Sequence, residues 1–158
     1  MTLSAIVAVD KNYGIGKGGG IPWHDPEDMQ WFRTMTTIVG KTVVMGRTTW
    51  DSLPVKPLPN RRNVIISKTP VYGVDSITGT DDQIVEAVKK ISVEEKAETF
   101  VIGGAKTYEL LIPHCQRLFI THIDGDYDCD TKLDIKLIHG FNELLFKSAD
   151  GKYQVWSR

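Results

Sequence analysis

Asp28 is the residue whose position most strongly suggests chemistry. The dipeptide Asp25-Pro26 before it is typical of an N-cap and the first residue of a helix. Apolar side chains follow Asp28 by three, four and seven positions, so its carboxyl shares the helix face of Trp31, Phe32 and Met35. Desolvation on such a face raises the pKa of a carboxyl, as in many general acids. An acid in the first turn also interacts well with the helix dipole. The spacing leaves both interpretations open, a functional acid or a helix-capping one.

Two strand-to-helix junctions place glycine where a phosphate group would fit. Gly103-Gly104 follows an apolar run and precedes a helical one, which exposes backbone N–H groups at a helix start. The second junction is Gly46-Arg47-Thr48-Thr49. Arg47, and Lys68 after the run 63–67, carry charge suited to a further phosphate such as a 2′-phosphate. Neither junction has the full G-x-G-x-x-G pattern, so tight turns and solvated strand ends are the alternative interpretation.

Other kinds of site are not indicated. The histidines lack metal-ligand spacing and no G-x-S-x-G nucleophile motif is present. With 19 basic and 20 acidic residues and no long basic run, the chain is not expected to bind nucleic acid. Cys115 and Cys129 are expected to be free thiols, which suits a reducing compartment. No apolar run approaches the roughly 18 residues of a membrane span, so we expect a soluble, cytoplasmic protein.

The elements that must position these residues follow from local patterns. A chain of 158 residues suits one domain, residues 1–158. Short runs rich in β-branched residues predict buried strands at 3–9, 42–45, 63–67 and 99–102. Helices are predicted to begin at Asp25-Pro26, after Gly46 and at the capping box of residues 80–83, and to span 105–112 before Pro113.

This alternation predicts an α/β fold with a central, mostly parallel, twisted sheet and helices on both faces. After Arg117 the pattern changes to strands alone, at 117–123, 143–148 and 152–156. The last two are separated by Ala149-Asp150-Gly151, which is typical of a hairpin turn. The sheet is therefore expected to end in a C-terminal antiparallel hairpin.

The succession of motifs resembles that of the dihydrofolate reductase family. The segments, which lie between about residues 3 and 131, are IVAVDKNYGIG, IPWHDPEDMQWF, VVMGRTTWDSL, PLPNRRNVIIS, FVIGGAKTYE and LFITHIDGDYDCDT. The resemblance implies reduction of 7,8-dihydrofolate to 5,6,7,8-tetrahydrofolate, with a hydride from NADPH passing to C6 and a proton to N5. It further implies a role in one-carbon metabolism and thymidylate synthesis, a monomer, and neither a metal nor a membrane or nucleic-acid partner.

The resemblance also implies a substrate site around Asp28. This acid would be the only ionisable side chain in the pterin pocket, anchored by Trp23 through water and by the Thr121 hydroxyl. The remaining substrate contacts would be the Ile6 and Ile102 carbonyls, the packing residues Val7, Ala8, Met29 and Phe32, Leu53 and Leu58 at the aminobenzoyl ring, Arg61 at the glutamate α-carboxylate, and Tyr108.

The cofactor residues are implied in the same way. Arg47, Thr48, Ser67 and Lys68 would face the adenosine 2′-phosphate, while Thr49 and the backbone of Gly104, Ala105, Lys106 and Thr107 would hold the pyrophosphate. Tyr108 would border the nicotinamide, and the site would be completed by Ala8, Ile15, Gly16, Ile21, Gly46, Ile102 and Gly103.

Residues 16–21 resemble the mobile loop that closes over the nicotinamide in this family. Here Gly18, Gly19 and Gly20 stand in succession, which should widen the loop's conformational range and make its closure entropically costly. Asp25 also departs from the family pattern, since an apolar residue is usual there, and Asp134 replaces an expected proline.

Two alternatives share the implied fold. A reductase acting on a riboflavin-pathway pyrimidine would lack the pocket of Trp23 and Asp28 and the Arg61 clamp. A folate- and NADPH-binding protein with negligible turnover would keep both, and only an assay of NADPH oxidation separates it from an enzyme.

Overall fold

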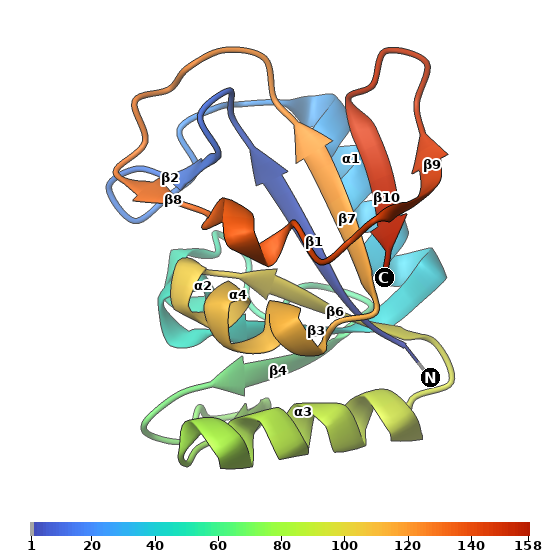
Figure 1. The fold of residues 1–158 in the computed structure, drawn as a ribbon. Helices are drawn as coiled ribbons and strands as arrows, with labels where there is room; N and C mark the ends of the chain where they lie inside the picture. The colour runs from blue at the N-terminus through green and yellow to red at the C-terminus, as the bar shows by residue number, and fades with distance from the viewer. Residues whose placement is uncertain (1) are drawn as a thin grey trace.

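The computed structural model describes residues 2–158 and shows a central sheet with helices on both faces (Figure 1). Within these residues the main sheet has eight strands, in the order β5-β4-β3-β6-β1-β7-β10-β9. They are β1 (Leu3–Val9), β3 (Gly40–Gly46), β4 (Arg62–Ile66), β5 (Asp75–Ile77), β6 (Glu98–Gly103), β7 (Arg117–His122), β9 (Glu143–Lys147) and β10 (Tyr153–Ser157). The short strands β2 (Gly14–Gly16) and β8 (Thr131–Lys132) pair separately.

The helices are α1 (Pro26–Thr34), α2 (Arg47–Ser52), α3 (Asp81–Glu94) and α4 (Ala105–Leu111). A π-helical turn, Met35–Val39, continues α1, and 3₁₀ turns occupy Ile112–His114 and Ile135–Leu137. None of the helices in residues 2–158 combines the length and the apolar character that crossing a membrane requires.

The pairing of the strands confirms the predicted topology. Strands β5, β4, β3, β6, β1 and β7 are parallel to one another, while β10 pairs antiparallel with both β7 and β9. The run 3–9 coincides with β1, and the other runs overlap β3, β4, β6, β7, β9 and β10. Strand β5 was not predicted, because three residues are too few to show a period.

Two apolar layers hold the helices against the sheet. On one face Val7 and Val44 pack with Val88 of α3 and Leu111 of α4. On the other face Phe100 and neighbouring strand residues pack with Trp50 of α2 and with residues of α1. In Figure 1 α4 lies in front of the sheet and α1 behind it. Strand β1 is therefore covered by helices on both faces of the sheet, and its carboxyl end lies between α1 and α4.

The predicted helix starts are present. The Asp25 side chain accepts a hydrogen bond from the Asp28 backbone N–H at 3.0 Å, and Pro26 is the first residue of α1. Thr80 and Gln83 form the expected reciprocal capping box of α3. The predicted helix 105–112 ends at Leu111 instead, where the chain tightens into the 3₁₀ turn that contains Pro113.

The π-helical turn after α1 was not predicted. The Thr36 and Thr37 hydroxyls donate to the carbonyls of Phe32 and Arg33, four residues earlier, at 2.8 and 2.7 Å. Such bonds compete with the regular backbone ladder and favour a distorted helix end. The turn places Thr36 beneath the cleft described next.

Candidate active site

One cleft of about 2060 Å³ opens at the carboxyl end of the parallel strands, the usual place for ligands in such sheets. Every candidate residue named from the sequence lies on its wall, from Ile6 of β1 to Thr121 of β7. The Pro-rich connection after α2 also contributes to the wall, through Leu58 and its neighbours.

Asp28 lies in the first turn of α1 with its side chain half-buried. Burial raises the pKa of this carboxyl above its ordinary value, and the nearby Thr121 hydroxyl offsets the rise in part. The charges of Asp25 and Glu27 raise the pKa further, whereas the Lys152 ammonium lowers it. Asp28 is therefore an acid that holds its proton to a higher pH than an exposed aspartate does.

Tyr108 of α4 closes the inner side of the cleft. Its side chain is buried and its hydroxyl donates to the Ile6 carbonyl of β1 at 2.7 Å. Burial raises the pKa of Tyr108, so the phenol stays neutral over the physiological range. The Ile6 carbonyl, predicted as a substrate contact, is thus also the acceptor of a hydrogen bond from α4.

Arg61 is held at the opposite end of the cleft. Its Nε donates to the Pro59 carbonyl at 2.9 Å and its Nη1 donates to the Thr36 hydroxyl at 2.9 Å. The guanidinium also lies 6.0 Å from the Phe32 ring centroid. Thr36 was missed by the sequence analysis, since its contact with Arg61 depends on the π-helical turn. The remaining N–H groups of the Arg61 guanidinium are free to donate to an anion in the cleft.

The two glycine junctions predicted to suit phosphate lie side by side. A Cβ atom on Gly46 would stand 2.6 Å from the Thr107 hydroxyl of α4, and one on Gly104 would be 3.4 Å from the Thr49 hydroxyl of α2. Gly103 has φ of +120°, a conformation that glycine adopts readily. The starts of α2 and α4 therefore approach closely through glycine.

Arg47 begins α2 beside this junction. Its Nη1 donates to the Ser67 hydroxyl at 3.2 Å and its Nε donates to Asp51 at 3.1 Å. Lys68 follows Ser67 and is exposed on the same rim of the cleft. The structure thus gathers the cations and hydroxyls that the sequence suggested for a further phosphate.

The glycine-rich loop forms an ordered turn. Lys17 and Gly20 exchange backbone hydrogen bonds of 2.8 and 3.1 Å, with Gly18 at φ +60° and Gly19 at φ +83° between them. Positive φ at both central positions is the type I′ pattern of two-residue hairpins. The Gly18 N–H also donates to Asp130 at 2.9 Å. A Gly-Gly pair is typical of such a hairpin turn, but the sequence analysis considered only the conformational freedom of these glycines.

Trp23 lies between this loop and α1. Its ring makes an edge-to-face contact with Tyr127, with ring centroids 5.4 Å apart, and also borders the cleft. The segment containing Tyr127 therefore supports the same wall of the cleft as the glycine turn.

Lys152 is a charged neighbour of Asp28 that the sequence analysis missed. Its Nζ lies 2.8 Å from Asp25 and 3.4 Å from Glu27, next to Asp28. Asp25 had been noted as a departure from an apolar pattern, and its partner 127 positions away explains how a carboxylate is accommodated there.

Residues 2–158 contain no group of three or more His, Cys, Asp or Glu side chains that could hold a metal ion. Cys115 and Cys129 are buried, separate thiols.

Comparison with known proteins places this geometry in a family. The family model described as dihydrofolate reductase matches residues 2–147. The chain is 36% identical over 155 residues to a dihydrofolate reductase of Buchnera aphidicola subsp. Acyrthosiphon pisum, covering 98% of this chain and 92% of that protein. It is 38% identical over 144 residues to a dihydrofolate reductase of Schistosoma mansoni, covering 83% and 77%.

Among solved structures, the chain is similar to dihydrofolate reductase from Enterococcus faecalis complexed with NADP(H) and RAB-propyl. The TM-score is 0.80 at 28% sequence identity, and the match covers 99% of this chain and 96% of that one.

Proposed function

The chain belongs to the dihydrofolate reductase family and reduces 7,8-dihydrofolate with NADPH; from this premise we propose which of its residues carry out each part of the reaction. The observation that carries the proposal is the place of Asp28, an acid with a raised pKa on the wall of a cleft that is also lined by the Arg61 guanidinium and by the glycines at the starts of α2 and α4.

The reaction adds a hydride to C6 and a proton to N5 of the pterin. NADPH supplies the hydride when it is bound. We assign to Asp28 the task of holding the pterin ring and helping a proton reach N5, because a general acid works best with a pKa near the working pH and burial moves Asp28 in that direction. Thr121 and Trp23 would orient Asp28 and its water.

The rest of the substrate would extend along the cleft towards Arg61. Phe32, Leu53 and Leu58 offer apolar surface for the aminobenzoyl ring, and all three border the same cavity. The Arg61 guanidinium, oriented by Pro59 and Thr36, would bind the glutamate carboxylate. The reacting atoms are thus positioned chiefly by binding, which can lower a barrier by several kcal/mol.

The residues present also fit NADPH. At the Gly46 junction the Thr107 hydroxyl occupies the space that a Cβ atom would need, so glycine allows the starts of α2 and α4 to lie close enough to face one ligand. The first N–H groups of α4 would hold the pyrophosphate, and Arg47, Ser67 and Lys68 would hold the 2′-phosphate. The turn at 17–20 and Ile21 would cover the nicotinamide and exclude water.

A cytoplasmic monomer of one domain, residues 1–158, completes the proposal. Two buried thiols suit a reducing compartment, and a monomer is what the resemblance to the family implies. Light scattering of the purified protein tests the oligomeric state.

The decisive experiment compares hydride transfer by the parent enzyme and Asp28→Asn in rapid mixing from about pH 5 to 9. The variant should be slower near neutral pH by roughly 10²–10⁴, the usual loss for a general acid–base residue. Its rate should keep rising as the pH falls, because solution protonation of the substrate replaces the enzyme's help. The parent rate should level off at the pKa of its own site, and deuterated NADPH verifies that chemistry is observed.

Asp82→Asn serves as the matched control, since Asp82 is also a first-turn acid, on α3, but is exposed. It should behave as the parent does. An Asp28→Asn enzyme slowed by one constant factor at every pH would contradict the assigned role. Negligible NADPH oxidation by the parent with dihydrofolate would favour the binding-only alternative.

A further inference from the structure

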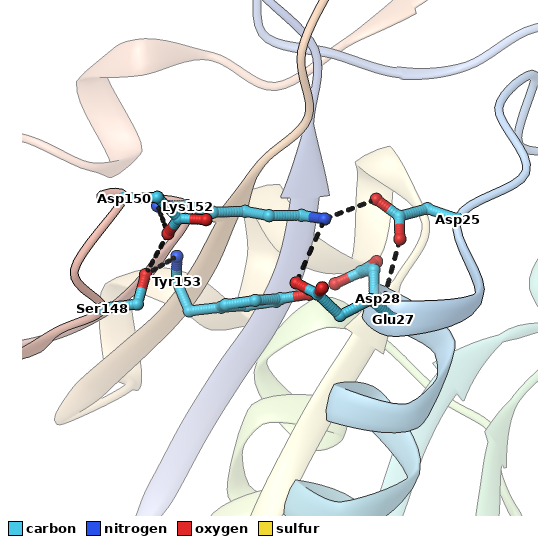
Figure 2. A network of polar contacts seen from close by, with 7 residues as sticks. All are labelled: Asp25, Glu27, Asp28, Ser148, Asp150, Lys152 and Tyr153. Carbon is cyan, nitrogen blue, oxygen red and sulfur yellow. Dashed lines mark hydrogen bonds and ion pairs between the residues drawn. The ribbon is translucent and has the colours of Figure 1, made fainter.

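A cluster of charged side chains joins the C-terminal hairpin to the start of α1 (Figure 2). The Lys152 ammonium lies 2.8 Å from Asp25 Oδ2 and 3.4 Å from Glu27 Oε1. The Tyr153 hydroxyl donates to Glu27 at 2.9 Å. Asp25 in turn accepts from the Asp28 backbone N–H, so Lys152 is connected to the backbone of Asp28 through one side chain.

The hairpin holds Lys152 in a defined place. Asp150 Oδ1 accepts from the Lys152 backbone N–H at 3.0 Å and from the Ser148 hydroxyl at 2.7 Å, while Ser148 Oγ accepts from the Tyr153 N–H at 3.0 Å. The Tyr153 ring packs against Trp31 of α1 with centroids 4.7 Å apart. The Lys152 side chain thus extends from a hydrogen-bonded turn and is only 22% exposed.

The charges around Asp28 come from three elements. Asp25 and Glu27 belong to the start of α1, Lys152 and Tyr153 to the hairpin, and Tyr108 to α4. Burial raises the pKa of Tyr153 to about 12, with the Glu27 bond adding to the rise, and Tyr108 is neutral as well. Burial alone would lower the pKa of Lys152, but the pairs with Asp25 and Glu27 outweigh it and raise this pKa, so Lys152 remains protonated.

We propose that Lys152 is a positioning residue for the reaction: by binding Asp25 and Glu27 it fixes the first turn of α1 under the substrate and offsets the negative charge that these two acids place beside Asp28. The inference rests on the proposed function of Asp28, and it explains why an acid at position 25 is compatible with the site. Without the ammonium, two unopposed carboxylates act on Asp28 and disfavour its ionised form.

The test follows the Asp28 carboxyl itself, by carbon-detected NMR titration with ¹³C-labelled aspartate, in the parent and in Lys152→Met. Removal of the ammonium should raise the titration midpoint of Asp28 by about 0.5–1 pH unit, as expected for one nearby charge in a partly solvated site. The hydride-transfer profile should move by the same amount, while KM for NADPH should not change. The shift should shrink at high salt.

Three further variants separate charge from mere packing. Lys152→Arg keeps the charge and should restore the parent midpoint. Asp25→Asn keeps an N-cap acceptor but removes one negative charge, so it should lower the midpoint, opposite to Lys152→Met. The double variant Asp25→Asn with Lys152→Met leaves the same net charge beside Asp28 as in the parent and should return the midpoint towards it.

Lys147→Met is the matched control, because Lys147 lies on the same hairpin, is exposed and has no ion pair among residues 2–158. It should leave the midpoint unchanged. An Asp28 midpoint that is the same in the parent, Lys152→Met and Asp25→Asn overturns the proposal. If the midpoint moves as expected while the hydride-transfer rate does not respond, Lys152 sets the charge beside Asp28 but is not a positioning residue for the reaction, and the proposed role of Asp28 fails.

Discussion

Asp10 and Asp28 are both carboxyls partly or fully shielded from solvent, yet their environments shift the two pKa values in opposite directions. Asp10, after β1, is 3% exposed and its Oδ1 accepts from the backbone N–H groups of Asn12 and Gly14 at 2.9 and 2.7 Å. Its Oδ2 accepts from the Tyr127 N–H at 3.1 Å and from the Cys129 thiol. Burial alone would raise the pKa of Asp10, but these donors outweigh it and lower the pKa.

Asp28 is less buried than Asp10 but has far fewer donors. Burial dominates its pKa, which rises, and the Thr121 hydroxyl and the Lys152 charge offset only part of that rise. The contrast shows that four hydrogen-bond donors can outweigh burial and lower the pKa of a carboxyl, whereas the single hydroxyl and the ammonium near Asp28 do not. Asp10 connects residues 12–14, which precede the glycine turn, to residues 127–129. The Asp28 carboxyl borders the cleft and is accessible to a ligand there.

The largest expected effect is a difference in hydride-transfer rate between variants of the two acids. Asp10→Asn should transfer hydride within about tenfold of the parent per folded molecule, because Asp10 does not border the cleft, whereas Asp28→Asn should lose roughly 10²–10⁴ near pH 7. Single-turnover rates normalised to the folded fraction provide the measurement. Equal losses in the two variants would break the comparison.

The free energy of unfolding should rank the two variants in the opposite order, with Asp10→Asn the more impaired. In Asp10→Asn an amide N–H₂ group must face backbone donors, which should lower the free energy of unfolding by about 1–3 kcal/mol. Asp28→Asn removes a desolvated carboxyl, so its free energy of unfolding near neutral pH should equal or exceed that of the parent. Urea denaturation at pH 7 measures both, and a destabilised Asp28→Asn would show that this acid is structural after all.

The pH dependence of stability sharpens the comparison, because the two pKa shifts have opposite signs. The pKa of Asp10 is lowered on folding, so its contribution to stability is present above the unfolded pKa near 4 and is lost as the pH falls through the folded value. The pKa of Asp28 is raised, so its contribution is complete below about pH 4 and is lost as the pH rises through the folded value.

Urea titrations of the parent and both variants between about pH 3 and 7 should show these trends as differences. The stability advantage of the parent over Asp10→Asn should grow with pH, and its advantage over Asp28→Asn should decline. Parallel curves for all three proteins would mean that neither acid changes its pKa on folding.

The smallest effects are expected in the turn that covers the Asp28 side of the cleft. Gly19 has positive φ, so Gly19→Ala should cost about 1 kcal/mol, whereas at Gly20 the φ is not positive and nothing lies within 4 Å of an added Cβ. Gly20→Ala should therefore stabilise the turn by about 0.4–1 kcal/mol through the unfolded state. Amide hydrogen exchange at Gly18 reports the turn directly. If both alanines had the same effect, the type I′ turn would not be the conformation in solution.

Local patterns in the sequence account for most of the fold. The run 3–9 and the starts of α1 and α3 could be predicted because strand propensity and capping depend on residues within a few positions. The proposed site residues came from the resemblance, and all of them line one cleft. The π-helical turn, the short strand β5 and the hairpin form of the glycine segment were missed, the last despite a Gly-Gly signal.

By itself the sequence determined the strand and helix pattern, and it placed Asp28 on an apolar helix face. Only the tertiary structure decided which acids are compensated, because the partners are distant along the chain. Tyr127 donates to Asp10 from 117 positions away, and Lys152 reaches Asp25 from the last hairpin. A carboxyl's pKa depends on the donors and charges within a few ångströms, and sheet pairing and hairpin docking bring those together.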